Sequence, residues 1–398
     1  MSARPKGMMH VAALHHEDHK PRHDLFQSYH RPDQEKRIQA KIEDKEMLAP
    51  IESAYALQEG NKGHVSRVFR SGSPVAERIR TLLLVCADAR MGGMFDFDDF
   101  ATRGIAVVYV AGNVSGILAS PGVKDVFRRM DADSSVVIVG HAKCGAVHCA
   151  AERHNYRQHR NISSLLRLVR PEGELENLQA QAQALRDSAI FRSVAGKARI
   201  RVLTAFVDIS KKEPSICVIG GDAPADADRE LIERMEKRFM DRNRKQDLSQ
   251  QQFAHAVVIS GPSLPYDPRE IFSADANEIF CVSAGDFGGH AHKGALTGPE
   301  IGSLEMAAIG LLDQSAVASA EYSVAKNDTR HILLLHSDLA VIDAWEEELL
   351  KKSRMISGAL IAGDLEITSA IYDSQTGRVT MVRHLVNEDA ARAMDREL

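Results

Sequence analysis

Three side chains with the chemistry of zinc ligands follow two apolar runs of the chain. TLLLVCADAR, which begins at Thr81, contains Cys86, and SSVVIVGHAKCGAV contains His141 and Cys144. Zinc prefers thiolate and imidazole ligands, and catalytic zinc sites take three protein ligands and leave a position for water. The HxxC spacing places two of the three ligands on one tight turn. The sequence therefore predicts one zinc ion per chain, held by Cys86, His141 and Cys144.

An acid and a base follow the first of these ligands. Asp88 and Arg90 come two and four residues after Cys86. A carboxylate at Asp88 can accept a hydrogen bond from a zinc-bound hydroxide and keep it oriented, and an arginine is the side chain best shaped to hold a carboxylate through two hydrogen bonds. We expect catalytic roles for Asp88 and Arg90.

Both ligand motifs need strands to position them. The runs TLLLV and SSVVIVG are short, rich in branched apolar residues and bounded by turn residues, which is typical of buried parallel strands. Sites in open α/β sheets form beyond the carboxyl ends of such strands. The two motifs are therefore predicted to meet at one edge of a parallel sheet.

The two motifs together resemble those of a known family. CADAR followed by GHAKCGAV is similar to the β-class carbonic anhydrases, whose pattern is CxDxR and then HxxC in a GHxxCG turn. VYVAGN, from Val108 to Asn113, resembles the RNAGN strand end of that family, with Tyr109 and Val110 in place of its Arg-Asn pair. The resemblance implies a zinc enzyme that interconverts carbon dioxide and bicarbonate by attack of zinc-bound hydroxide. In part of the family the aspartate binds zinc at lower pH, which makes Asp88 a candidate fourth ligand.

Composition bounds the class of protein. The chain has 398 residues, a formal net charge of -5 and five cysteines, which favours two domains or one duplicated domain in a reducing cytoplasm. The charge gives no case for nucleic-acid binding, and no apolar run reaches the roughly 20 residues of a membrane span. Cys149, Cys217 and Cys281 lie in apolar segments and are predicted to be buried.

The second half of the chain repeats the order of the first. GSLEMAAIGL, LHSDLAV and IYDSQTGRVTMV resemble successive segments of the same family. Aligned on these segments, His336 keeps the histidine position and Leu339 replaces Cys144. The remaining positions of the first motif fall on Gly261, Ser263 and Pro265. One imidazole without thiolates does not hold zinc, so the second copy is predicted to be degenerate.

These observations predict an α/β fold of two tandem β-carbonic-anhydrase-like units. Each unit is expected to have a mostly parallel central sheet flanked by helices. Members of the resembled family are dimers with active sites at the subunit interface, so the two units are expected to form a pseudo-dimer within one chain. The expected divisions are a flexible histidine-rich tail over 1–35, a helical lead-in with the zinc-binding domain over 36–221, and a degenerate domain over 222–398. A metal-capturing role for the tail is the alternative.

Three further segments have predicted secondary structure. Residues 36–60 are predicted to form one or two amphipathic helices, broken near Pro50 and stopped at Gly60. The run ARIRVLTAFVDIS is predicted to be an edge strand. Residues 222–252 are predicted to be a connector and the leading helix of the next unit, with an apolar stripe that includes Leu231 and Phe239.

Substrate and location stay open at this stage. The segment around Thr102 and the change at Tyr109 depart from the family pattern, so a related zinc hydrolase acting on carbon disulfide or carbonyl sulfide is one alternative. A non-catalytic scaffold stabilised by zinc is another. The expected partners are a small-molecule substrate and further copies of the chain, with no nucleic acid and no membrane. Cytoplasmic location is expected, with the carboxysome as the alternative, because shell carbonic anhydrases there resemble this order of parts.

Overall fold

The computed structural model describes most of the chain. It covers residues 36–38, 40–41, 48–71, 78–119, 126–189, 191–193, 199–211, 213–244, 248, 254–261, 264–274, 278–284 and 314–387. The histidine-rich tail, Ser263 and the segment GSLEMAAIGL lie outside the described residues, so the predictions made for them are not addressed by the structure.

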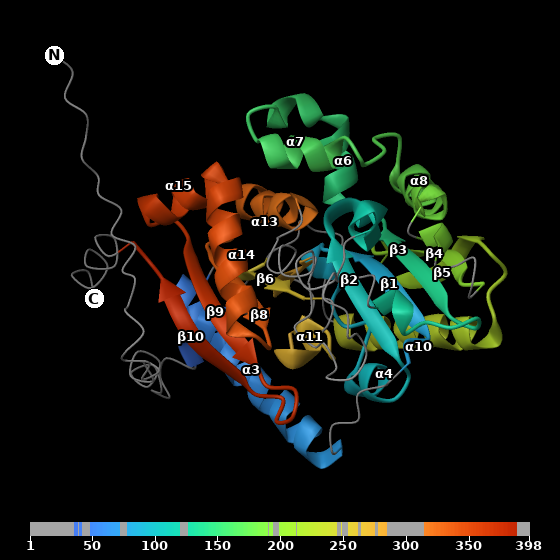
Figure 1. Ribbon diagram of the computed structural model, residues 1–398, viewed down its shortest axis with the longest axis horizontal. Helices are drawn as coiled ribbons and strands as arrows, with labels where there is room; N and C mark the ends of the chain where they lie inside the picture. The colour runs from blue at the N-terminus through green and yellow to red at the C-terminus, as the bar shows by residue number, and fades with distance from the viewer. Residues whose placement is uncertain are drawn as a thin grey trace, which may run out of the picture.

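The first half of the chain forms one five-stranded sheet (Figure 1). Its order is β2-β1-β3-β4-β5, with the first four strands parallel and β5 antiparallel to β4. The strands are β1 (Thr81–Cys86), β2 (Ile105–Val110), β3 (Ser135–His141), β4 (Arg201–Asp208) and β5 (Ser215–Gly221). The predicted strands over the two ligand motifs are confirmed, and every residue of β1 and β3 is buried. The prediction that ARIRVLTAFVDIS is an edge strand is wrong, because β4 lies between β3 and β5.

The second half forms another five-stranded sheet of order β10-β9-β8-β6-β7. Its strands are β6 (Ala256–Ser260), β7 (Ile279–Ser283), β8 (His331–His336), β9 (Glu366–Tyr372) and β10 (Val379–Leu385). Four strands are parallel, and β10 returns antiparallel to β9 through the predicted Thr376-Gly377 turn, where Gly377 has a φ of 71°. Counted from its own first strand, each sheet has the same strand order and the same single antiparallel edge. Two mostly parallel sheets are thus confirmed.

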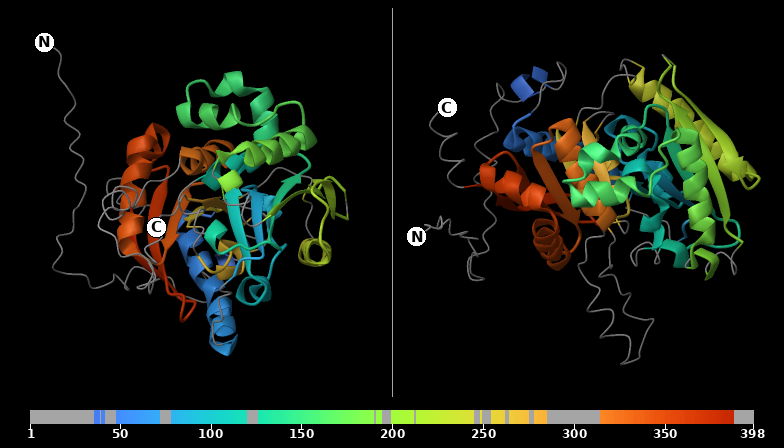
Figure 2. Two further views of the ribbon diagram at one scale, coloured as in Figure 1. Left: turned by 45° about the vertical axis from the view of Figure 1, so that its right-hand side comes forward. Right: turned by 90° about the horizontal axis from the view of Figure 1, so that it is seen from above.

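Helices flank both sheets, as predicted (Figures 1 and 2). They are α3 (Pro50–Ser71), α4 (Phe97–Ala101), α6 (Gly145–Ala151), α7 (Arg160–Leu166), α8 (Glu174–Asp187), α10 (Asp226–Asn243), α11 (Pro268–Ile271), α13 (Gln314–Asn327), α14 (Leu339–Lys352) and α15 (Arg354–Ala362). In the first half α8 packs on β3 and β4, and in the second α14 packs on β8. No helix within the described ranges is long and apolar enough to cross a membrane.

The helix that precedes the first sheet is longer than predicted. Pro50 begins α3, where its missing N–H costs nothing, but the helix passes through Gly60 and ends at Ser71. Gly60 has a packing role instead, because a Cβ atom there would overlap the carbonyl group of Phe272. This glycine lets α3 approach α11 of the second half closely.

The predicted charged helix is present as α10. Its apolar stripe, including Leu231 and Phe239, is buried, and the helix packs against β5 of the first sheet. Its position in the sequence suggested that it leads the next unit. The contact with β5 shows that it also covers the edge of the first sheet, and the division of the chain at residue 221 stays a prediction.

The two halves meet through β2 and β7. The backbone N–H of Tyr109 donates to Ser283 Oγ at 2.9 Å, and that of Ala111 donates to Ser319 Oγ at 3.2 Å. These donors belong to the outer side of an edge strand, where the sheet itself offers no acceptor. Side chains of the second half therefore satisfy the open edge of the first sheet.

Three buried histidines join α3 and the residues before it to the second half. His64 Nε2 bonds Tyr372 Oη at 3.0 Å, and His331 Nδ1 bonds Ser53 Oγ at 3.0 Å. Burial, together with the charge of Arg67 for His64 and of His384 for His331, lowers the pKa of each of these two histidines to about 3. Burial also lowers the pKa of His255 to about 4. All three are therefore neutral in the folded protein at pH 7.

Acidification should destabilise the protein through these histidines. Below their unfolded pKa of about 6.5 the unfolded chain takes up protons that the folded chain refuses, so stability is lost as the pH falls from about 6.5 towards 4. At pH 5 each histidine should cost roughly 2 kcal/mol of unfolding free energy. Urea unfolding at pH 7.5 and pH 5 measures this. A His331→Asn variant should show a smaller pH dependence, and equal unfolding free energies of the parent at the two pH values would contradict the prediction.

Candidate metal centre

Two neighbouring strands and one short helix hold the predicted ligands. Cys86 is the last residue of β1 and His141 the last residue of β3, which pairs with β1 in parallel. Cys144 caps the amino end of α6. Because parallel neighbours end at the same edge of the sheet, residues 55 or more positions apart in sequence meet there. The structure brings all three predicted ligands together.

The three ligand atoms lie close together, and the two sulfurs have the spacing that a tetrahedral metal requires. They lie within 4.8 Å of one another, and all three residues are buried. The Sγ atoms of Cys86 and Cys144 are 3.9 Å apart. Zinc–sulfur bonds of about 2.3 Å at tetrahedral angles place two sulfurs about 3.8 Å apart. The cluster is therefore able to bind a metal ion without rearrangement of its sulfurs.

His141 presents the correct nitrogen to the cluster. Its Nδ1 donates to the carbonyl oxygen of Ala142 at 2.9 Å, so Nε2 is the nitrogen available to a metal. Nε2 is buried and has no hydrogen-bond partner among the described residues. A buried polar atom without a partner is costly, and a metal ion bound at Nε2 would remove that cost.

The two thiols of the cluster lose their protons with unequal ease. The hydrogen bond with Cys144 lowers the pKa of Cys86 well below its usual value, against the opposing effect of burial, and His141 lowers it further. The same hydrogen bond, with burial, raises the pKa of Cys144. The pair thus loses its first proton easily and its second with difficulty. Since a metal binds thiolates, its binding should release protons.

Asp88 and Arg90 form a buried pair beside the cluster. Arg90 Nε donates to Asp88 Oδ1 at 2.9 Å and Arg90 Nη2 donates to Oδ2 at 2.6 Å, so the guanidinium holds both carboxylate oxygens. Asp88 Oδ2 lies 3.7 Å from Nε2 of His141. Burial raises the pKa of Asp88, but hydrogen bonds from Arg90 and the charge of His141 outweigh it and lower the pKa. Asp88 is therefore a carboxylate held next to the ligands.

Arg90 also holds the turn that carries two of the ligands. Its Nη2 donates to the carbonyl oxygen of Lys143 at 2.8 Å. Lys143 has a φ of 56°, the left-handed region, where a residue with a side chain is strained by about 1–3 kcal/mol. The turn places His141 and Cys144 on the same side of the sheet edge. One guanidinium thus fixes both the carboxylate and the ligand turn.

Asn113 is a positioning residue that the sequence motifs did not assign. Its Nδ2 donates to the carbonyl oxygen of Leu84 at 3.2 Å and to that of Val139 at 2.7 Å. These oxygens belong to β1 and β3, each two residues before the ligand that ends the strand. Asn113 therefore bridges the two strands where they begin to separate. The signal was present in VYVAGN, because a Gly-Asn pair after a strand favours the left-handed turn that Gly112 and Asn113 adopt.

The corresponding place in the second half has serine and leucine where the first half has its two cysteines. With His336 matched to His141, the strand pairings put Ser260 where Cys86 lies, and Leu339 is the first residue of α14. His336 Nδ1 accepts from the backbone N–H of Asp338 at 2.9 Å, and its ring contacts Trp345 edge-on. Cys86, His141 and Cys144 make up the metal-ligand cluster found in the part of the chain that the structure describes.

The second half nevertheless contains an aspartate and an arginine with the same local geometry, so the alignment with Gly261, Ser263 and Pro265 is corrected to Asp267 and Arg269. Asp267 caps α11 and its Oδ1 accepts from the N–H of Arg269 at 2.8 Å, just as Asp88 Oδ1 accepts from the N–H of Arg90 at 3.0 Å. The D-x-R spacing of DPRE matches that of CADAR, which is the signal that could have found it.

Arg269 reaches into the first half. Its Nη2 donates to the backbone oxygen of Asp88 at 3.2 Å, and its guanidinium lies 4.4 Å from the centre of the Tyr109 ring. The hydroxyl of Tyr109 donates to Asp267. Tyr109, which departs from the family pattern, therefore contacts both Asp267 and Arg269 of the second half.

Two further predictions need comment. Thr102 is exposed and its hydroxyl donates to the carbonyl oxygen of Asp98 at the end of α4. Cys149 and Cys281 are buried, but Cys217 is exposed, so its predicted burial is wrong. Cys217 lies on the edge strand β5, one face of which is open to solvent.

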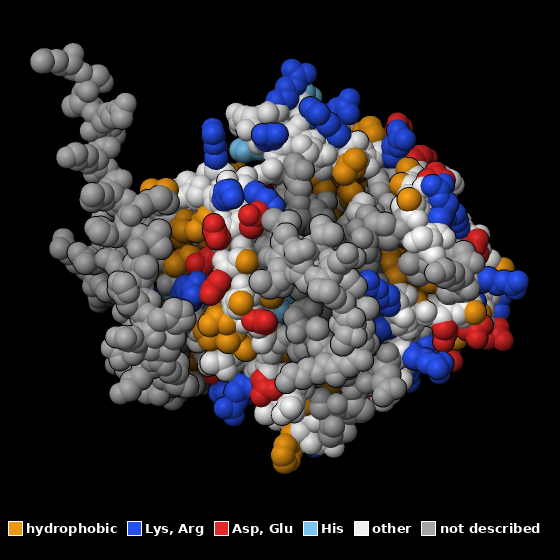
Figure 3. All heavy atoms as spheres, in the orientation of Figure 1, with side chains coloured by type: hydrophobic (Ala, Val, Ile, Leu, Met, Phe, Trp, Pro, Cys, Tyr) orange, Lys and Arg blue, Asp and Glu red, His pale blue; other side chains and the backbone are white. Residues whose placement is uncertain are grey.

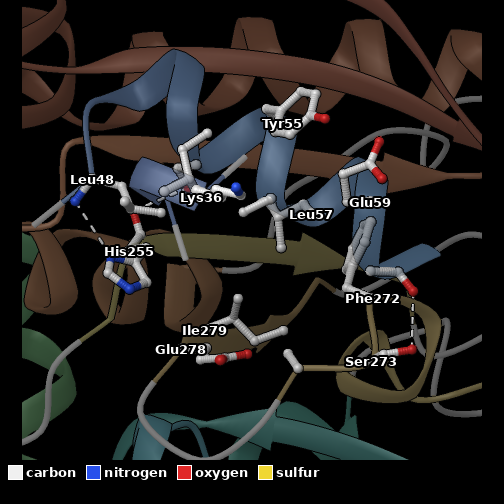
Figure 4. Close-up of a pocket in the computed structure, with 15 residues that line it drawn as sticks. Lys36, Leu48, Tyr55, Leu57, Glu59, His255, Phe272, Ser273, Glu278 and Ile279 are labelled. Carbon is white, nitrogen blue, oxygen red and sulfur yellow. Dashed lines mark hydrogen bonds between the residues drawn. The ribbon is translucent and has the colours of Figure 1, made fainter. Parts of the chain in front are cut away.

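A cavity of about 470 Å³ lies away from the metal ligands (Figure 4). Tyr55, Leu57 and Glu59 of α3 point into it from one side, and Phe272 and Ile279 of the second half line the other. Neither the ligands nor Asp88 and Arg90 line it. The candidate metal centre is a buried cluster and not part of this cavity.

Comparison with known proteins finds likeness in solved structures only. No protein-family model and no curated protein matches the chain. Solved β-carbonic anhydrases resemble part of it. One from the ascomycete Sordaria macrospora, described as tetrameric, is 16% identical, with 42% of this chain and 93% of that chain covered and a TM-score of 0.27. The β-carbonic anhydrase CcaA is 17% identical, with 44% of this chain and 92% of that chain covered and a TM-score of 0.30. CafA of Aspergillus fumigatus is 16% identical, with 45% of this chain and 94% of that chain covered and a TM-score of 0.28. Since these scores are low, we base the function on the chain's own residues.

Proposed function

We propose that the protein is a zinc-dependent carbonic anhydrase that hydrates carbon dioxide reversibly to bicarbonate. The observation that carries this proposal is the cluster of Cys86, His141 and Cys144 with a buried Nε2 that lacks a partner, next to the Asp88–Arg90 pair. Structural zinc sites close with a fourth cysteine or histidine, and the described residues offer none here. A three-ligand site beside a carboxylate favours catalysis over a scaffold role.

Each residue has a distinct part in this chemistry. Zinc held by the three ligands would lower the pKa of a water molecule to about 7 and so supply hydroxide near neutral pH. Asp88 lies beside the ligands, where its carboxylate would accept a hydrogen bond from hydroxide and orient it. Arg90 fixes Asp88 through both of its carboxylate oxygens. The ligands are at most 3% exposed, and a buried site suits a small uncharged substrate such as carbon dioxide.

Asp88 has a second proposed position, on the metal as its fourth ligand. In the structure both of its oxygens bond Arg90, so binding of Asp88 to the metal would require it to give up at least one of these bonds. We take the Arg90-bound position as the active one.

The hydration rate should rise with pH. The reactive form is deprotonated, with a pKa of about 7, and at lower pH the Asp88 carboxylate competes for the open position. The lowered pKa of Asp88 keeps this carboxylate ionised throughout the neutral range. Stopped-flow measurements of zinc-loaded protein between about pH 6 and pH 9 test this, and a rate independent of pH over that range would contradict it.

We further propose that the two halves are duplicated units arranged as a pseudo-dimer, with the second half completing the site of the first. The equal strand orders of the sheets support the duplication. The bond from Arg269 to Asp88 and the contact of Tyr109 with Asp267 support the shared site. In this arrangement Arg269 is a positioning residue, because it holds the backbone of Asp88.

A fragment of residues 71–220 should be insoluble or inactive when produced alone. It would expose the edge of β2 and lose α10 from β5, and it would lack Arg269. Solubility, zinc content and hydration rate of the fragment measure this, and co-expression with residues 221–398 is the control that should restore all three. A soluble and active fragment would refute the pseudo-dimer.

Carbon disulfide or carbonyl sulfide is the alternative substrate. The observation that favours it is Tyr109, which replaces the arginine of the family pattern and lies against Arg269 beside Asp88. Thr102 gives no comparable support, since its hydroxyl bonds its own helix. A stopped-flow assay of zinc-loaded protein with each of the three substrates decides. Stoichiometric zinc without carbon dioxide hydration would reject the proposed function.

A further inference from the structure

A second cavity, of about 380 Å³, lies between the helices that follow the metal ligands. Its walls come from the end of α6, the turn after it and α7. It is lined by Ala151, Arg153, His154, Arg157, Ser163 and Arg167. Three arginines and a histidine therefore face one hollow whose lining contains no acid. Its volume is within the range of about 300–1,000 Å³ that is typical of small-molecule sites.

Several arginines elsewhere in the chain are held by acidic side chains, unlike those of this cavity. In α10, Arg229, Arg234 and Arg238 each form an ion pair with an aspartate or glutamate. No acceptor among the described residues pairs with the guanidinium groups of Arg153 and Arg167, or with that of Arg157. The sequence explains this contrast, because residues 153–171 contain five arginines and no aspartate or glutamate.

This positive charge is local. The chain as a whole has a formal net charge of -5, so the segment stands out against an acidic background. Figure 3 shows lysine and arginine side chains gathered over the part of the surface where Figure 1 places α6 and α7. Cations are favoured near helix carboxyl ends, and Arg153 and Arg167 follow such ends. That preference accounts for Arg153 and for Arg167 taken separately. It does not account for three arginines that line one cavity.

The walls of the cavity are fixed by a packed base. Tyr156, Ile162 and Leu165 are buried beneath it, and α7 packs against α13 of the second half. Asn161 Nδ2 donates to Glu321 Oε1 at 2.8 Å. The backbone that carries the arginines is therefore held in place, which lowers the entropic cost of binding a ligand there.

We propose that this cavity binds a phosphate-bearing dianion. Guanidinium groups bond phosphate oxygens in pairs and keep their charge at every physiological pH. Three of them would neutralise a doubly charged group, and the hydroxyl of Ser163 and the ring of His154 add hydrogen-bonding groups. The phosphate can belong to a free phosphomonoester or to a lipid headgroup, since the recognising chemistry is the same. This site is separate from the metal cluster and does not depend on the proposed hydration activity.

Titration calorimetry of the full chain at constant ionic strength tests the proposal, with inorganic phosphate and glycerol 3-phosphate as probes. The expected result is saturable binding of one probe per chain. A double variant, Arg157→Gln with Arg167→Gln, should weaken it about ten-fold or more. The matched control, Arg192→Gln with Arg354→Gln, changes the charge equally at two exposed positions outside the cavity and should bind as the parent does.

Further arms identify the source of the phosphate and exclude the metal centre. Binding should persist in Cys86→Ser, and loss there would overturn the proposal because the probe would then lie on the metal. Vesicles containing phosphatidic acid, compared with phosphatidylcholine alone, test the lipid source. Binding to them that the double variant loses would support the site with a lipid as ligand. No saturable binding to any probe, equal loss in the control variant, or equal affinity for polyglutamate would each overturn the proposal.

Discussion

Replacement of Cys86 by serine is expected to remove the metal and the activity together. A serine hydroxyl is a poor zinc ligand near neutral pH. Without the Cys86 thiolate, only His141 and Cys144 remain as ligands. Zinc content should fall from about one ion per chain to near zero, and the hydration rate by about 10³-fold or more, because water without the metal has a pKa near 15.7. Metal analysis and stopped-flow hydration measure the two effects.

The chain offers a matched control for this variant. Cys217 is an exposed cysteine on β5, so Cys217→Ser is the same chemical change outside the cluster. It should keep zinc and activity at the level of the parent. A Cys86→Ser variant that retained stoichiometric zinc would show that the metal lies elsewhere.

Replacement of Asp88 by asparagine is expected to separate catalysis from metal binding. The variant should keep zinc, because Cys86, His141 and Cys144 are unchanged. Its hydration rate should fall by about 10- to 100-fold, the usual effect of removing a group that orients a metal-bound ligand. It should also unfold more easily by about 3 kcal/mol, since Arg90, 4% exposed, would lose the charge that compensates its own.

A second buried aspartate separates the catalytic effect from loss of stability. Asp228 pairs with Arg201 and accepts a bond from Ser135 Oγ, at the opposite end of β3 from His141. Asp228→Asn should lower the unfolding free energy without lowering the rate per folded molecule. Equal rate losses in Asp88→Asn and Asp228→Asn would mean that Asp88 acts only through folding.

The residues of the candidate site could be predicted because the signals are local. Cys86 with Asp88 and Arg90, and His141 with Cys144, lie within a few positions of a strand end, and a strand end is visible in an apolar run. The parallel pairing of β1 and β3 then follows from the rules for such sheets. The individual hydrogen bonds, such as the one from Arg90 to the carbonyl oxygen of Lys143, could not be predicted from the sequence because they depend on the folded geometry.

The errors came from contacts between distant segments. β4 was predicted to be an edge strand because its sequence alternates between polar and apolar residues, but β5 pairs with its outer side. Gly60 was predicted to end a helix, because glycine is common there. The contact that requires a glycine at this position is with Phe272, more than 200 residues away in the sequence. Asp267 was missed because it comes seven residues after Ser260, whereas Asp88 comes two after Cys86. The D-x-R spacing identifies Asp267 once the distance from the strand end is left open, but no local spacing rule predicts the pairing of β4 with β5 or the contact at Gly60.

The contact between β2 and β7 has a consequence for how the protein behaves on dilution. When an active site is shared between separate subunits, its completeness depends on protein concentration and on the dissociation constant of the dimer. Here Tyr109 and Asp267 belong to one chain, so their encounter has an effective concentration set by the intervening polypeptide. In the proposed pseudo-dimer the metal centre should therefore remain complete in a single molecule at any dilution.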